Sequence, residues 1–201
     1  GLSTTKFAAL TPAQLAAFSS TQMSALTSAQ LAALTPAQMG ALTPKQIAGL
    51  STDVLHSLSS GQVAGLTNRQ MSALSATQFD ALSSAGLAAL GSQQVSGLTA
   101  AQAATLTAAE LNSFSADEIA AIKKNVVAGI STAAIAGLST SLVSAITTAQ
   151  IAGLNSAQLR ALTAAQLATL SSGQIAALKP DQIASLTTDA IAALNDATLS
   201  A

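Results

Sequence analysis

Hydrophobic residues recur along this chain with a period of eight. Starting at Leu2, every eighth residue is Leu, Ile or Phe, through Leu10 and Phe18 and on to Leu194, without an insertion. Residues 2–201 therefore form 25 consecutive octads, whose positions we call a to h, with the recurring residue at position a. A second apolar residue stands at position f in every octad except one, where Ala103 replaces it. The unbroken phase predicts one continuous repeat domain over residues 2–201 and indicates a segment of a longer array.

The polar positions predict that each octad starts a helix. All four prolines lie at position c, which are Pro12, Pro36, Pro44 and Pro180. Proline is favoured at the first helical residue, so position b is the expected N-cap. Position b is Ser or Thr in 20 of the 25 octads, and position e is Gln in 15. Ser or Thr followed three residues later by Gln is a capping box, and positions a and f then form a hydrophobic staple.

One long helix or a set of strands fits this pattern poorly. A period of eight advances about 80° beyond two helical turns, so positions a and f would spiral around a continuous helix. Each internal proline would also cost such a helix about 3 kcal/mol. Alanine is depleted in strands, and the apolar spacing here alternates five and three instead of two. We expect short helices of about six residues, with a corner at positions h and a, where glycine would supply a left-handed residue.

Such short helices are stable only when neighbouring octads bury positions a and f, which predicts an all-α solenoid of 25 repeats with one helix each. The number of octads per superhelical turn is open at this point. Two per turn, as antiparallel hairpins, is the favoured arrangement, and three per turn, as a triangular coil, is the next.

Composition narrows the classes of function. The chain has 7 Lys and Arg against 8 Asp and Glu, and charged residues make up 7% of it. It carries no basic stripe for nucleic acid, no cysteine for disulfides or thiolate metal sites, and no apolar run long enough to insert into a membrane. No triad, paired carboxylates or phosphate-binding loop is evident, so we expect no enzyme, no catalytic residue, no cofactor, no metal site and no small-molecule substrate.

Three features nevertheless qualify as candidate sites. His56, the one histidine, follows Asp53 by three residues; we interpret it as an exposed residue without a role and not as a metal or haem ligand. The segment from Glu110 to Lys124 is rich in charge and precedes Val126, Ala134 and Leu142 at position e. It indicates sequence drift, or alternatively a contact patch or a change of pitch. The Ser and Thr row at position b could form an ice- or glycan-binding surface, but capping already accounts for it.

The phrase L-(S/T)-x-x-Q-(L/I/V)-x-(A/G) resembles octapeptide tracts of very large bacterial surface or secreted proteins, which are often labelled adhesins or haem-utilisation proteins. The resemblance covers the entire chain and implies an extracellular or cell-surface structural setting. We therefore expect a component of a filament, fibre or stalk. A solenoid binding module that presents a Ser- and Thr-rich face is the alternative.

The first and last octads suggest self-association. The first keeps Leu2 and Phe7 and the last keeps Leu194 and Leu199, while Asn195 and Asp196 add little polarity. Solenoids that end usually carry more polar terminal repeats. The expected partner is a second copy of the chain, joined end to end or side by side, with little dependence on salt because few charges are present.

Overall fold

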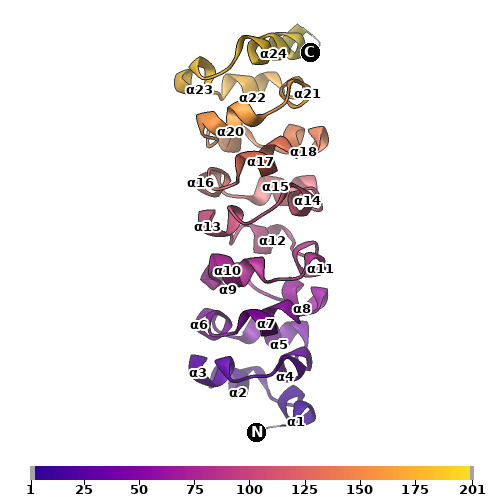
Figure 1. Ribbon diagram of the computed structural model, residues 1–201. Coiled ribbons are helices and arrows are strands. Elements are labelled where there is room, and N and C mark those ends of the chain that lie inside the picture. Colours follow the sequence, from indigo (N-terminus) through magenta and orange to yellow (C-terminus); the bar gives the residue numbers. More distant parts are fainter. Residues whose placement is uncertain (1–2, 200–201) are drawn as a thin grey trace. The chain divides into compact units, whose positions relative to one another are not determined.

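The computed structural model describes residues 3–199 of the chain, with side chains as far as Leu194. Every regular element in this part is an α-helix, and the helices follow one another in close succession along the chain (Figure 1). The prediction of an all-α solenoid of short helices is confirmed. Leu2 and the side chains of Asn195, Asp196 and Leu199, which entered the expectation for the chain ends, lie outside the described part.

The chain divides into two compact units, Gly1–Gln102 and Ala103–Ala201. Helices of the first unit are α1 (Thr4–Ala8), α2 (Pro12–Ala16), α3 (Ser20–Ser24), α4 (Ser28–Ala32), α5 (Pro36–Ala41), α6 (Pro44–Ala48), α7 (Thr52–His56), α8 (Ser60–Ala64), α9 (Asn68–Ala73), α10 (Ala76–Asp80), α11 (Ser84–Leu87) and α12 (Ser92–Val95). Helix α13 (Ala100–Ala103) spans the division. Helices of the second unit are α14 (Ala108–Leu111), α15 (Ala116–Ala121), α16 (Lys124–Val127), α17 (Thr132–Ala136), α18 (Thr140–Ala145), α19 (Thr148–Ile151), α20 (Ser156–Ala161), α21 (Ala164–Leu167), α22 (Ser172–Ala176), α23 (Pro180–Ala184) and α24 (Thr188–Leu199).

The helices start where the capping pattern places them. In α5 the extended residue Thr35 (φ −72°, ψ 160°) is the N-cap and Pro36 is the first helical residue. The Gln38 amide donates to Thr35 Oγ1 over 3.2 Å, and the Thr35 amide donates to Gln38 Oε1 over 2.8 Å. This reciprocal pair satisfies two amides that a helix start leaves without partners. At Gly91 and Lys179 only the glutamine half of the pair forms.

The corner between octads uses no left-handed residue. The residue after α6, Gly49, is right-handed helical (φ −81°, ψ −9°), and described residues with positive φ are absent, glycines included. The expectation of a left-handed glycine at position h is therefore wrong. The physical reason for these glycines is close approach: a Cβ on Gly49 would lie 2.8 Å from Ser20 O, and one on Gly153 would lie 2.6 Å from Lys124 O.

Three octads make one turn of the coil in each unit. Each helix packs on the helix three places later, as α1 does on α4 and α2 on α5 in the first unit, and α14 on α17 and α15 on α18 in the second. The favoured expectation of two octads per turn is wrong. Paired hairpins would place each helix against its immediate neighbours, whereas the extended residues at positions a and b turn the chain by about a third of a circle.

Positions a and f form the core of each unit. Leu15, Met39 and Leu55 at position f are fully buried, and Leu50 and Leu66 at position a are nearly so. The first aromatic residues add an edge-to-face contact, with the rings of Phe7 and Phe18 5.8 Å apart. The rule of one helix per octad has one exception, because α24 continues through Leu194 where a corner is expected.

Candidate functional site

Glutamines at position e are the buried polar residues of the described chain. They are at most 6% exposed and are Gln46, Gln62, Gln70, Gln94, Gln102, Gln150, Gln158, Gln166, Gln174 and Gln182. A buried amide is costly unless it is hydrogen-bonded, so so many of them in one repeat position require partners. Every described buried side-chain nitrogen or oxygen does have one.

Gln70 shows how the group is satisfied. Its Oε1 accepts from the Thr67 amide over 2.6 Å, which is the local capping bond. Its Nε2 donates to Met39 O over 2.8 Å and to Leu42 O over 2.6 Å, both at the corner after α5 in the preceding turn. One side chain thus caps the start of its own helix and binds the carbonyls that end an earlier one. We call this arrangement a glutamine clamp.

The clamp recurs with a fixed register in both units. The amide nitrogen donates to the carbonyl 28 positions earlier and to one 30 or 31 positions earlier. In the first unit the clamps are Gln38, Gln46, Gln62, Gln70, Gln78, Gln94 and Gln102. In the second unit they are Gln150, Gln158, Gln166, Gln174 and Gln182.

The chemistry of a clamp is adhesion between turns. The amide is neutral, is saturated by three backbone groups, and has no nucleophilic or acidic atom to offer a substrate. Each hydrogen bond contributes about 0.5–1.5 kcal/mol net, and the buried backbone groups would be unsatisfied without it. The clamps therefore hold successive turns in register.

The charged segment interrupts this arrangement. Glu110 and Glu118 keep the capping half, because Oε2 accepts from the Thr107 amide over 2.8 Å and from the Ser115 amide over 2.7 Å. An ionised carboxylate has no proton to donate, so the clamp half is lost. Val126, Ala134 and Leu142, listed here by their shared position e, are buried apolar residues.

Two larger side chains at position g replace a clamp from below. Asn112 donates through Nδ2 to Gly137 O over 2.8 Å and accepts from the Ser139 amide at Oδ1 over 2.8 Å. Ser139 is the N-cap of the octad in which Leu142 stands where glutamine would be, so Asn112 supplies the missing acceptor. His56 has the same position in its octad, and its Nδ1 lies 3.1 Å from Ala81 O.

The sequence carries a matching rule at a spacing of 30 residues. Ala, Gly or Ser stands 30 positions before each glutamine at position e from Gln38 to Gln182. The four larger residues at position g stand 30 positions before residues other than glutamine; the pairs are His56 and Gly86, Asp80 and Glu110, Asn112 and Leu142, and Arg160 and Ala190. A small residue at position g thus accompanies a clamp.

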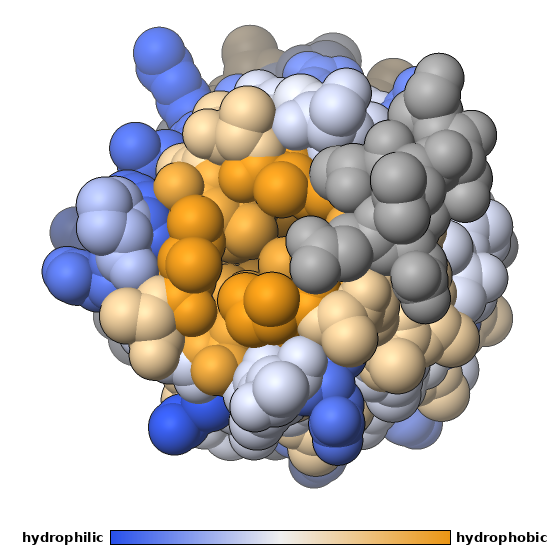
Figure 2. All heavy atoms as spheres, turned by 90° about the horizontal axis from the view of Figure 1, so that it is seen from above, coloured by the Kyte–Doolittle hydropathy of each residue, from blue (hydrophilic) through white to orange (hydrophobic). Residues whose placement is uncertain are grey.

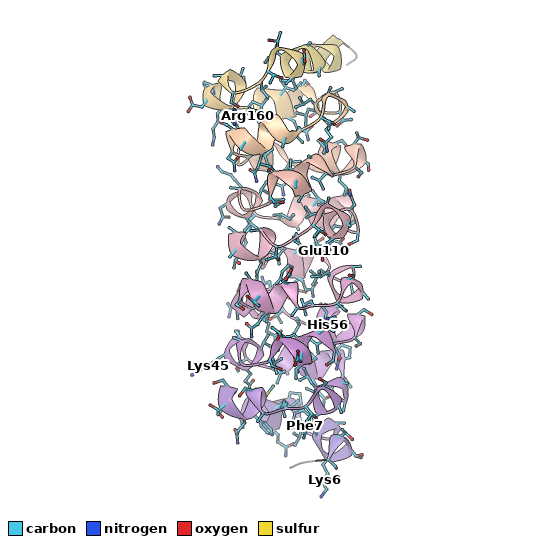
Figure 3. The ribbon with its side chains drawn as sticks, in the orientation of Figure 1. Lys6, Phe7, Lys45, His56, Glu110 and Arg160 are labelled. Atoms are coloured by element: carbon cyan, nitrogen blue, oxygen red, sulfur yellow. The ribbon has the colours of Figure 1, made fainter. Side chains whose placement is uncertain are left out.

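The predicted candidates occupy simple places in this scheme. His56 is exposed on α7, as expected, and its ring contacts a carbonyl of the next turn (Figure 3). Asp53, also on α7, is exposed, and the described residues contain no group of three potential metal ligands. The hydroxyls at position b accept bonds from helix amides, as Thr35 does from Gln38. Among the described helices, none has the length and hydrophobicity needed to cross a bilayer.

The second unit also contains a small apolar cavity of about 20 Å³. It is lined by Leu111, Ile119, Ile122, Val127, Ile130, Ile135, Leu138, Ile146 and Gln150. The volume corresponds to about one water molecule, and the lining offers almost no polar partner. We interpret it as a packing gap between β-branched side chains.

Sequence comparison identifies the repeat. The profile of a family described as the ALTTAQ repeat matches residues 1–36, 23–52, 143–180 and 151–188, which together make up just under half of the chain. Tandem matches show that the chain is a repeat protein. No curated protein matches this sequence.

Proposed function

We propose that this chain is a structural component of a filament, fibre or stalk. The observation that carries the proposal is the glutamine clamp: the buried polar side chains of the described residues all connect one turn to another. The exposed positions are mostly Ala, Ser, Thr and Gln without a site of distinct chemistry. A chain that concentrates its buried hydrogen bonds between turns is suited to bearing load and keeping distance.

The setting we propose is extracellular or on the cell surface. Support comes from the resemblance of the octads to tracts of large bacterial surface proteins. Labelling of intact cells with an antibody against this chain tests the setting, because an intracellular protein would stay unlabelled until the cells are opened.

The load-bearing role can be measured on a single chain held between two handles. We expect stepwise extension under force, with steps near multiples of a 24-residue turn, which is about 80 Å of extended chain. Replacing Gln70 and Gln166 by Leu should lower the force at which the first steps occur. Extension without steps, as for an unstructured chain, would contradict the proposal, and saturable binding of a glycan by the wild type would favour a binding module instead.

A further inference from the structure

The first and last turns of the chain expose different halves of the core. In the first turn the exposed surface belongs to position a, since Leu10, Phe18 and Leu26 are only half-buried. In the last turn it belongs mainly to position f, since Ile183 is 44% exposed and Ile175 and Ile191 are half-buried, together with Leu186. Figure 2 views the C-terminal end and shows the hydrophobic surface there.

These two surfaces are the two sides of one interface. Elsewhere in the units, position f residues such as Met39 and position a residues such as Leu66 are buried, because a neighbouring turn covers each of them. Position a loses its cover where the preceding turn is missing, and position f loses its cover where the following turn is missing. The first-turn surface therefore has the composition that covers the last-turn surface.

The hydrogen-bonding groups at the two ends are complementary as well. Gln14 and Gln22 are exposed and accept from the Thr11 and Ser19 amides over 2.8 Å, but no preceding turn offers carbonyls to their Nε2 groups. Gln14, Ala17, Phe18 and Gln22 line a shallow hollow of about 140 Å³. Lys6, at position e of the first octad, also ends in donors and points out of this end (Figure 3).

The matching carbonyls lie at the corner between α23 and α24. A clamp binds carbonyls 28 and 31 positions earlier, one at position a and one at position f. If a second copy continues the octad count after Ala201, its Gln14 stands 31 positions after Ile183 and 28 after Leu186. These are the two least buried core residues at that corner, so the free donors meet carbonyls beside the exposed apolar surface.

We propose that a second copy of this chain docks its first turn on the last turn, head to tail, with Gln14 clamping Ile183 O and Leu186 O. This inference deepens the proposed structural function and rests on it. Because the two contact surfaces differ, the contact is heterologous and can add further copies. The chain then polymerises with the same interface that joins its own turns.

The test uses the full chain in sedimentation velocity over a series of concentrations. The wild type is expected to form dimers and larger species as concentration rises. Gln14→Glu with Gln22→Glu should abolish this association, since a carboxylate keeps the capping bond, as Glu110 does, but cannot donate to a carbonyl. Ile183→Asp should abolish it from the other end. Matched controls are Gln93→Glu and Ala165→Asp, which change exposed side positions and should leave association unchanged.

Mixing the two disabled variants separates this contact from others. Each retains one working surface, so a head-to-tail contact predicts a one-to-one dimer and no larger species. Dimers of the Gln14→Glu, Gln22→Glu variant alone would overturn the proposal in favour of a symmetric contact. A wild type that stays monomeric at every concentration would overturn it too; if that monomer still resists force in steps, the load-bearing role stands without the docking.

Discussion

At the scale of single residues, the choice of Gln over Glu is the feature that the local pattern explains least. Both residues complete a capping box, and Glu110 and Glu118 do so here. Only glutamine also brings an N–H₂ group, and Gln70 uses it on Met39 O and Leu42 O. The capping role was predictable from residues three apart. The clamp was not, because its partners are about 30 residues away, although the unassigned amide hydrogens were a visible clue.

Removing one clamp tests its contribution directly. Gln70→Leu keeps the volume and removes the partners of the Thr67 amide and of two carbonyls, so the free energy of unfolding should fall by about 2–4 kcal/mol. Urea denaturation followed by circular dichroism measures this. Gln93→Leu, at an exposed position, is the control and should stay within about 0.5 kcal/mol of the wild type.

The N-cap hydroxyls make a smaller and separate contribution. Thr35→Ala removes the acceptor of the Gln38 amide and should cost about 1 kcal/mol, whereas Thr35→Asp should be tolerated because a carboxylate caps equally well. Thermal melting of both variants is the measurement. Equal melting temperatures for wild type and Thr35→Ala would show that position b does not cap.

At the scale of the element, each octad follows from its own sequence while its connection to other octads does not. Helix starts at proline and the burial of positions a and f were predictable, because these interactions span fewer than eight residues. The angle at the corner depends on how closely the next turn approaches, which Gly49 against Ser20 O decides. Three octads per turn and the right-handed glycines were therefore missed.

The exchange between positions g and e can be tested as a pair. Asn112→Ala removes the partner of the Ser139 amide, and Leu142→Gln alone adds a side chain that competes with Asn112 for it. The double variant restores the small residue and the clamp together, so we expect favourable coupling of about 1–2 kcal/mol in a double-mutant cycle. Asn125→Ala combined with Leu142→Gln is the control pair, and its effects should simply add.

At the scale of the whole molecule, equivalent octads make length adjustable in steps of eight. Deleting residues 162–169, one octad with a clamp, should leave a folded and slightly less stable protein, because stability in such arrays is nearly a sum over repeats. Deleting residues 162–165 alone shifts every later residue to a wrong position and should prevent the second unit from folding cooperatively. Circular dichroism and melting distinguish the two. A folded half-octad deletion with wild-type cooperativity would contradict the proposed register.

The small-residue rule at position g has a consequence for how such a gene can change. An in-frame gain or loss of eight codons keeps each clamp above an alanine, glycine or serine wherever the neighbouring octads are of the common type. The same event beside Asn112 or His56 separates a matched pair by 38 or 22 residues and leaves a large side chain beneath a glutamine. Replication slippage is therefore expected to spread through the uniform octads and to be selected against around these two residues, which would persist as fixed landmarks while the array around them lengthens and shortens.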